Sequence, residues 1–331
     1  MSSRILLTHQ FKNDAFASPE RSEGLRRLAQ FGELEDEAPV LTAEHAENTV
    51  ATIASSVPYT DEFYAAAKDL RIVARWGVGF DQVNLAAATA NGVIVTVTPV
   101  HMDTVAEYTI AQWLATMKRV YTLNRLSHAG DFSIIRTYEA QYATLGIYGC
   151  GRIGQEVAKR ARPLLGEHGR LLVYDVRPDI QEIADLYGAE VVDSPRSLFE
   201  RCDTVSLHVS GDATIVTYDL LCAMQPHASL INPSRGNLVD DQAVHRAIEE
   251  ERLYYYVVDD PVNGTRAIHK DHPRIICTNH NAGVSVESTI RLDLKAIEQV
   301  TDALEGRKPD FILNPEVLDH PRVREWLQTP Q

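Results

Sequence analysis

The sequence lacks paired cysteines and long apolar runs. Its four cysteines, Cys150, Cys202, Cys222 and Cys277, are scattered, and none forms a C-x-x-C pair. This spacing argues against a disulfide framework and a metal site, and it fits a reducing compartment. No apolar run approaches the length needed to cross a membrane, and residues 1–10 are too weakly apolar for a signal peptide. We therefore expect a cytoplasmic protein that does not contact the membrane.

Positive charge is also scarce. The chain has 46 Asp and Glu residues against 32 Lys and Arg residues, a formal net charge of -14. A surface of this sign repels a phosphate backbone, so nucleic acid is not an expected partner. At 331 residues the chain is long enough for about two domains, each with its own core.

Short apolar runs rich in β-branched residues alternate with helix-forming stretches. In the first part of the chain the runs lie at residues 4–8, 50–54, 70–74 and 93–97, with helical sequence at 61–69 and 84–90. This alternation predicts a parallel α/β unit. It breaks at Thr98-Pro99, after which Thr104-Val105-Ala106-Glu107 predicts a capping box that opens a long helix to about Lys118.

A second alternating series follows a polar stretch at 119–143, which we expect to be irregular. Its apolar runs lie at residues 171–174, 204–208, 229–232, 254–258 and 275–278. They predict a second parallel sheet. A helix is then expected from Ser285 to Gly306, returning to pack on the first domain.

Between the two series lies a glycine turn, Gly149-Cys150-Gly151-Arg152-Ile153-Gly154. An apolar strand precedes it and helix-forming sequence follows it. The G-x-G-x-x-G spacing permits a tight turn, a close backbone approach to a pyrophosphate, and close packing of helix on strand. The helix N-terminus would then face the phosphates.

A carboxylate stands at the expected distance beyond this turn. Asp175 ends the next apolar run, about twenty residues past Gly154, where a carboxylate binds the ribose hydroxyls of NAD. It would repel the additional phosphate of NADP, so NAD is favoured. Arg177 could pair with such a phosphate, although plain solvation is the preferred interpretation.

Two further polar residues follow strand ends in the second series. Arg235 comes just after the run at 229–232, and its guanidinium matches a carboxylate. His280 comes just after the run at 275–278 and is suited to transfer a proton near neutral pH. His269 and His272 are rivals without a strand to position them, and we expect them to be solvated.

Together these motifs resemble the D-isomer-specific 2-hydroxyacid dehydrogenases, in a form like D-3-phosphoglycerate dehydrogenase without a C-terminal regulatory domain. The resemblance rests on the glycine turn, Asp175, Ser234-Arg235-Gly236 and the segment that begins with His280. It also rests on the loop Arg75 to Leu85, on Val105-Ala106-Glu107 and on Asn314-Pro315. It implies an α/β fold of two doubly wound parallel-sheet domains. A Rossmann NAD-binding domain, residues 101–284, would be inserted into a flavodoxin-like substrate-binding domain, residues 1–100 plus 285–331.

The resemblance also implies an NAD-dependent enzyme that transfers a hydride between nicotinamide and a small anionic D-2-hydroxy acid or 2-oxo acid. Arg235 and the backbone N–H groups of Val78 and Gly79 would bind the substrate, and His280 would transfer the proton. The implied cofactor-binding residues are Gly149, Gly151, Arg152, Ile153, Gly154, Asp175 and His208. A homodimer is implied by the helix from Thr104 and the segment after it.

One part of the family pattern is missing. A glutamate that binds the catalytic histidine is usual, but no glutamate lies between Arg252 and Val286. Asp260 is the first choice for its replacement and Asp259 the second, unless both aspartates only cap the strand. This gap keeps open a nucleotide-binding corepressor-like or sensor protein, or a dehydrogenase of another anion or of a sugar acid. Trp76 would narrow the substrate pocket or pack within its own domain.

Overall fold

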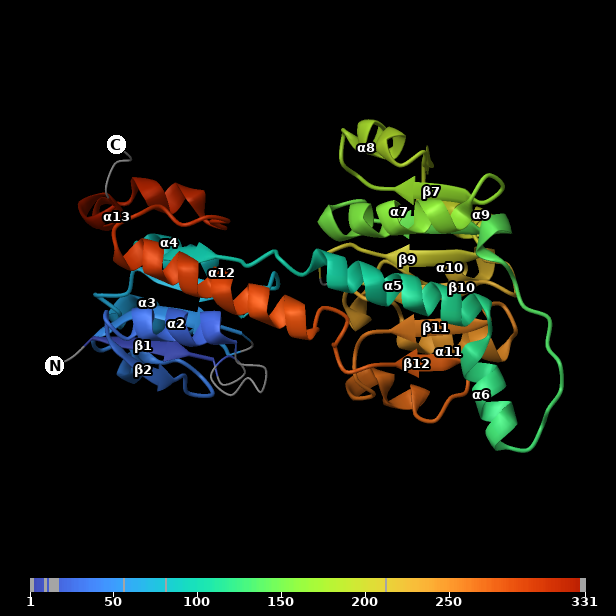
Figure 1. Ribbon diagram of the computed structural model, residues 1–331, viewed down its shortest axis with the longest axis horizontal. Coiled ribbons are helices and arrows are strands. Elements are labelled where there is room, and N and C mark those ends of the chain that lie inside the picture. The colour runs from blue at the N-terminus through green and yellow to red at the C-terminus, as the bar shows by residue number, and fades with distance from the viewer. Residues whose placement is uncertain are drawn as a thin grey trace. The chain divides into compact units, whose positions relative to one another are not determined.

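The computed structural model describes residues 3–8, 11, 18–55, 57–80, 82–211 and 213–327. Residues 1–2 and 9–10 of the amino-terminal segment and Asp81 of the glycine loop lie outside these ranges. The chain divides into two compact units, one formed by Met1–His101 with Ser285–Gln331 and the other by Met102–Val284. Each unit is built on one parallel sheet (Figure 1).

The first unit has five parallel strands in the order β2-β1-β3-β4-β5. This is the flavodoxin-like strand order, as predicted. The edge strand β2 was not expected because its sequence, ELED, is mostly charged, as suits an exposed edge. The strands are β1 (Arg4–Leu7), β2 (Glu33–Asp36), β3 (Thr49–Ala54), β4 (Ile72–Arg75) and β5 (Ile94–Thr96).

Helices cover both faces of this sheet because successive strand residues point to opposite sides. Ile5 and Leu7 join one buried cluster, whereas Leu6 joins the other. The predicted return of the C-terminal helix is confirmed, since α12 contacts α2, β3 and β4. Its capping box pairs Ser285 with Ser288. The helices are α2 (Pro19–Leu28), α3 (Asp61–Ala66), α4 (Leu85–Ala90), α12 (Val286–Leu304) and α13 (Pro321–Trp326), with short 3-10 turns η1 (Ala43–His45) and η5 (Pro315–Asp319).

The second unit has seven parallel strands in the order β12-β11-β10-β9-β6-β7-β8. Counted from β6, the first six follow the Rossmann order 3-2-1-4-5-6, and β12 extends the sheet by one strand. The strands are β6 (Thr144–Tyr148), β7 (Arg170–Tyr174), β8 (Glu190–Val191), β9 (Thr204–Leu207), β10 (Ser229–Asn232), β11 (Tyr255–Val258) and β12 (Ile275–Cys277).

Two buried clusters flank this sheet. Ile231 and Val257 belong to the cluster shared with α5 and α7, and Leu230 and Tyr256 to the one shared with α9 to α11. The doubly wound fold is therefore confirmed for this unit. Its helices are α5 (Met102–Met117), α6 (Val120–His128), α7 (Arg152–Leu165), α8 (Ile180–Leu186), α9 (Pro195–Arg201), α10 (Tyr218–Ala223) and α11 (Asp241–Glu249), with 3-10 turns η2 (Ala140–Tyr142), η3 (Gly236–Leu238) and η4 (Gly264–His269).

Two local predictions were wrong. Helix α5 begins at Met102, so Thr104 lies inside its first turn and does not cap it. Part of the stretch expected to be irregular is helix α6, where the Thr122 N–H donates to the Tyr255 hydroxyl at 3.1 Å. Its Thr, Asn and Ser residues have weak helix propensity, and tertiary contacts override that preference.

No helix in the described ranges is long and apolar enough to span a membrane.

Candidate active site

The glycine turn joins β6 directly to α7, and each glycine is required for a different reason. Gly149 has a φ of 92°, and a Cβ on it would lie 2.7 Å from the His208 carbonyl oxygen. A Cβ on Gly154 would lie 2.2 Å from the Gly149 carbonyl oxygen. By contrast, no atom of the described residues lies within 4 Å of the Cβ position of Gly151. The backbone at Gly151 is therefore open to a ligand at the N-terminus of α7.

Asp175 ties the end of β7 to this turn. Its Oδ2 accepts the Cys150 N–H at 2.6 Å, and its Oδ1 accepts the Arg177 N–H at 3.0 Å. Each carboxylate oxygen has a second lone pair, which could accept a ribose hydroxyl. The Arg177 side chain is not simply solvated, because its Nε lies 2.6 Å from Asp179 Oδ1. The positive charge of Arg177 is thus already paired with a carboxylate.

His208 lies at the end of β9, on the other side of the glycine turn. Its Nε2 lies 2.7 Å from Ser206 Oγ, and its Nδ1 is buried without a hydrogen-bond partner among the described residues. Burial lowers the pKa of His208 to about 3, so the ring is neutral at physiological pH. It can form the wall of a cofactor site without adding charge.

The loop after β10 holds Arg235 in a fixed backbone geometry. Buried Asn232 accepts the Ser234 N–H at 3.1 Å and donates through Nδ2 to the Arg235 carbonyl oxygen at 2.8 Å. The Ser234 hydroxyl donates to the Leu207 carbonyl oxygen at 2.8 Å, which ties this loop to β9. Arg235 Nη1 donates to the Ser234 carbonyl oxygen at 2.8 Å.

His280 and Asp260 meet at the ends of the next two strands. The Nδ1 of His280 lies 3.2 Å from Asp260 Oδ1, and Asp260 Oδ2 accepts the Gly236 N–H at 2.7 Å. Asp260 therefore contacts both the histidine and the residue that follows Arg235. Segments after β10, β11 and β12 come together at the carboxyl ends of the strands, where open α/β sheets bind ligands.

Asp259, the second choice, is engaged elsewhere. It is 4% exposed and accepts the N–H groups of Asn281 at 2.8 Å and Ala282 at 2.6 Å, as well as the Thr278 hydroxyl. His280 lies between the residues that bind Asp259, and its backbone is left-handed, with a φ of 57°. That conformation costs a non-glycine residue roughly 1–2 kcal/mol. The hydrogen bonds to Asp259 on both sides of His280 help to hold this conformation.

The contact between His280 and Asp260 also shifts the pKa of both side chains. The hydrogen bond to Asp260 raises the pKa of His280, against the opposing effects of desolvation and of the Arg235 charge. For Asp260, burial acts to raise the pKa. The hydrogen bonds from His280 and Gly236 and the Arg266 charge outweigh it, so the pKa lies below its usual value. The protonated imidazole beside an ionised carboxylate is therefore favoured.

The two rival histidines are not solvated, so that prediction was wrong. His269 is 2% exposed, with Nε2 3.1 Å from Asp241 Oδ1. His272 Nε2 lies 3.0 Å from Glu249 Oε1. The turn η4 packs the polar segment against α11. No strand or helix periodicity in the sequence signals that packing.

Side chains of the first unit hold the backbone of its glycine loop in place. Buried Arg75 donates through Nε to the Gly79 carbonyl oxygen at 2.6 Å, and the Thr98 hydroxyl accepts the Gly77 N–H at 2.6 Å. Among the described residues, no acceptor pairs with the N–H groups of Val78 and Gly79. Trp76 packs within its own unit, and its Nε1 donates to Asp293 Oδ1 at 2.7 Å.

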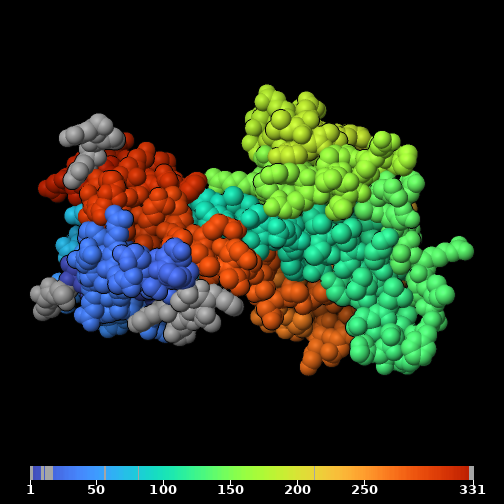
Figure 2. Space-filling model, viewed as in Figure 1, coloured from blue at the N-terminus to red at the C-terminus, as the bar shows by residue number. Residues whose placement is uncertain are grey.

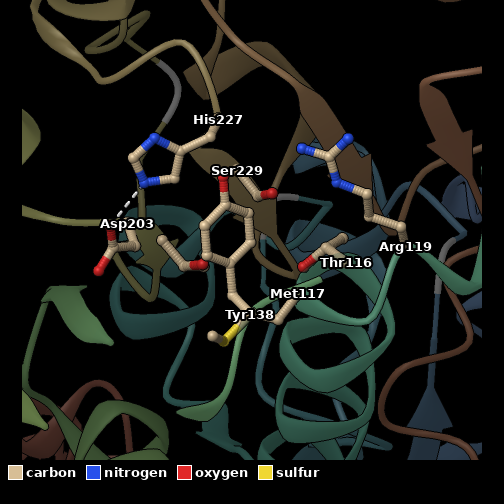
Figure 3. Close-up of a pocket in the computed structure, with 8 residues that line it drawn as sticks. Thr116, Met117, Arg119, Tyr138, Asp203, His227 and Ser229 are labelled. Carbon is tan, nitrogen blue, oxygen red and sulfur yellow. Dashed lines mark hydrogen bonds and ion pairs between the residues drawn. The ribbon is translucent and has the colours of Figure 1, made fainter. Parts of the chain in front are cut away.

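Figure 3 shows a cavity at the opposite end of the second sheet. Its lining includes Asp203, Thr204 and Ser229, at or next to the starts of β9 and β10. His227 pairs with Asp203 at 2.8 Å and stacks on Tyr138. Since this is the amino end of the strands, we do not assign the active site to this cavity. Within the described ranges, no group of three or more His, Cys, Asp or Glu residues is placed to hold a metal.

The open backbone at Gly151, the side-chain oxygens of Asp175 beside the turn and the neutral His208 fit a dinucleotide, and comparisons with known proteins agree. Residues 110–282 match the family model described as D-isomer specific 2-hydroxyacid dehydrogenase, NAD binding domain. The glyoxylate reductase of Korarchaeum cryptofilum is 31% identical over 96% of this chain and 98% of its own length. The D-3-phosphoglycerate dehydrogenase of Methanocaldococcus jannaschii is 27% identical over 89% of this chain and 58% of its own length.

A solved structure shows the same fold. D-2-hydroxyisocaproate dehydrogenase superposes with a TM-score of 0.78 at 19% identity, covering 94% of this chain and 99% of that one. The chain therefore belongs to the D-isomer specific 2-hydroxyacid dehydrogenase family, and it is an NAD-dependent oxidoreductase that acts on a CH–OH group.

Proposed function

We propose that this enzyme interconverts a small 2-oxo acid, of the size of glyoxylate or hydroxypyruvate, and the corresponding 2-hydroxy acid, which has the D configuration where it is chiral. The observation that carries the proposal is the His280–Asp260 pair, whose Asp260 also binds Gly236, next to Arg235. A proton donor and a fixed cation are what a developing alkoxide next to a carboxylate requires. The size of the substrate is suggested by relatives named glyoxylate reductase and hydroxypyruvate reductase.

In the reducing direction, the hydride for the 2-oxo carbon would come from NADH when this cofactor is bound. Arg235 binds the substrate carboxylate and polarises the adjacent carbonyl oxygen. Because Asp260 occupies Nδ1 of His280, the proton is donated from Nε2 to that oxygen. Hydride and proton together convert C=O to CH–OH, and the reverse reaction returns the proton to His280.

For the cofactor, we propose that Gly149, Gly151, Arg152, Ile153 and Gly154 hold the pyrophosphate at the start of α7. Asp175 accepts the ribose hydroxyls, and neutral His208 lines the site. On the first unit, the Val78 and Gly79 N–H groups donate to the substrate carboxylate. Their lack of acceptors among the described residues supports this role.

The test is loss of NADH absorbance with a panel of 2-oxo acids that includes glyoxylate, hydroxypyruvate and pyruvate. We expect turnover of at least one, with NADH preferred to NADPH. Tight NADH binding without turnover of any acid would favour the sensor interpretation instead.

A companion variant tests the assignment of Arg235. Arg235→Ala removes the cation that binds the carboxylate, so we expect kcat/KM to fall by about 100-fold or more, with unchanged NADH affinity. The matched control is Arg196→Ala, which removes a surface arginine that pairs with Glu200 on α9. Full activity of Arg235→Ala would contradict the assignment.

We further propose a cytoplasmic homodimer. Phe132 and Ile134, 81% and 98% exposed, lie on the segment that follows α6. Apolar side chains this exposed on a projecting segment suit a second copy of the chain. The four cysteines are free thiols, which suits a reducing compartment.

A further inference from the structure

A buried ion cluster lies behind the His280–Asp260 pair. Arg266 has a side chain only 15% exposed, and it sits between two carboxylates. Its Nη2 lies 3.5 Å from Asp260 Oδ2, and its Nη1 lies 3.9 Å from Asp241 Oδ2. Nε donates to the Pro261 carbonyl oxygen at 3.2 Å, which further restricts the guanidinium.

Asp241 is itself held in place at the start of α11. Its side chain is 5% exposed, and it bonds the Thr265 hydroxyl and His269 Nε2. The glycine of the Ser234-Arg235-Gly236 segment makes room for this arrangement. A Cβ on Gly236 would lie 2.1 Å from Arg266 Nη1 and 2.6 Å from Asp260 Oδ2.

The two oxygens of Asp260 face different partners. Oδ1 faces His280, whereas Oδ2 faces the Gly236 N–H and Arg266. One negative charge is therefore shared between a guanidinium and an imidazole. The Gly236 N–H bond does not involve Arg266, so it would keep Asp260 in place if the guanidinium were removed.

We propose that Arg266 is a positioning residue that acts through Asp260 to limit how strongly His280 holds its proton, and that Asp241 limits the effect of Arg266. The inference rests on the proposed function only for the consequence in catalysis. Its basis is that a positive charge beside Asp260 weakens the attraction of this carboxylate for the imidazolium.

Other titratable groups also lie near the ion cluster. Burial raises the pKa of Cys277 to about 11 and raises the pKa of Tyr256 strongly, so both stay neutral. Asp259 and Arg235 act on His280 but are unchanged in the variants below. The groups that face the cluster are Asp259, Arg235, Tyr256, Cys277, His269 and, stacked on His269, His245.

The test is an NMR titration of His280 in the full-length chain with isotope-labelled histidine, with the resonance identified by its loss in His280→Gln. Arg266→Gln should raise the His280 pKa by about half a unit, given the partial exposure of the ring. Arg266→Lys keeps the charge and should leave the pKa near its original value. Asp241→Asn removes the carboxylate that partly neutralises Arg266, so it should lower the pKa of His280.

A double variant separates the route through Asp260 from a direct effect. If Arg266 acts through this carboxylate, Arg266→Gln should change the pKa much less in an Asp260→Asn background. An unchanged or lowered pKa in Arg266→Gln would overturn the proposal, as would a shift of equal size in Arg266→Lys. Should Arg266→Gln fail to fold, Asp241→Asn still decides, because a His280 pKa that stays unchanged or rises in this variant would also overturn the proposal.

The titration needs no turnover, so it tests this inference even if the proposed reaction is wrong. In an active enzyme the same variants should move the high-pH limb of kcat/KM for 2-oxo acid reduction in the same directions. A His280 pKa that shifts without moving that limb would refute the role of His280 as proton donor, while leaving its coupling to Arg266 established.

Discussion

At the residue scale, an aspartate supplies the carboxylate beside His280, since no glutamate lies between Arg252 and Val286. Asp260 follows Asp259 immediately after β11, so its carboxylate starts close to the end of the sheet. The shorter side chain still reaches His280 Nδ1, at 3.2 Å. An aspartate at this position therefore forms a carboxylate–histidine pair.

Removing the charge of Asp260 should change the pH dependence of the reaction. Asp260 raises the pKa of His280, and reduction by the proposed mechanism needs the protonated ring, so we expect activity to persist to higher pH while the pair is intact. In Asp260→Asn the high-pH limb of kcat/KM should therefore move to lower pH by about 1 unit. Profiles of kcat/KM for the wild type and for Asp193→Asn, an exposed control, should coincide. An unmoved limb in Asp260→Asn would rule out this coupling.

Asp259 should affect stability more than proton transfer. Asp259→Ala leaves the Asn281 and Ala282 N–H groups without their acceptor, and the latter is buried. We expect a loss of about 2–3 kcal/mol in the free energy of unfolding, measured by urea denaturation. Asp259→Asn retains one carbonyl oxygen as acceptor, so it should lose less. Equal stability of Asp259→Ala and the wild type would show that the hydrogen bonds of Asp259 around His280 do not stabilise the fold.

At the element scale, the strand, turn and helix at β6 and α7 act as one unit. Gly149 and Gly154 serve the fold, because a Cβ on either would meet backbone atoms at 2.7 Å and 2.2 Å. Gly151 has no such neighbour among the described residues, and its φ of -74° suits any residue. Its lack of a side chain therefore leaves the turn open, as the proposed pyrophosphate site requires.

This division predicts opposite results for two alanine variants. Gly151→Ala should keep the melting temperature of the wild type but weaken NADH binding by about tenfold or more, because the methyl group occupies the approach of the pyrophosphate. Gly154→Ala should lower the melting temperature as well as NADH affinity. Calorimetry for binding and thermal unfolding for stability distinguish the two. Wild-type NADH affinity in Gly151→Ala would place the pyrophosphate elsewhere.

At the scale of the whole molecule, the segment after α6 exposes the apolar side chains of Phe132 and Ile134. The segment after α6 projects from the Met102–Val284 unit, in green at its edge (Figure 2). Figure 1 shows it as a long extended segment, in green, that follows α6. Its exposed apolar side chains underlie the proposed dimer.

A charge on this segment should separate the subunits. Ile134→Asp places a carboxylate at a side chain 98% exposed, so the folded chain should tolerate it, whereas an interface would not. Light scattering should report a dimeric mass for the wild type and a monomeric mass for the variant. The control is Leu186→Asp, a side chain 75% exposed on α8. A monomeric wild type at micromolar concentration would refute the dimer.

Much of the fold was readable from the sequence because it depends on local pattern. Buried parallel strands are short apolar runs, and a glycine turn between strand and helix has a fixed spacing. The parallel sheets, the flavodoxin-like and Rossmann orders and the return of α12 followed from such runs and from the family resemblance. Edge strand β2 and helix α6 were not predicted, because a charged edge strand and a polar helix contain no such apolar run.

The sequence by itself determined which residues stand at the strand ends: Asp175, Arg235, Asp259, Asp260 and His280. It could not choose between the adjacent aspartates, and only the tertiary structure separated them by placing Asp260 on the His280 ring and Asp259 on the backbone around it. The same holds for Arg266 and Asp241, which no motif marks. Contacts between neighbouring strand ends depend on side-chain direction across the sheet, and that information lies in no single stretch of the chain.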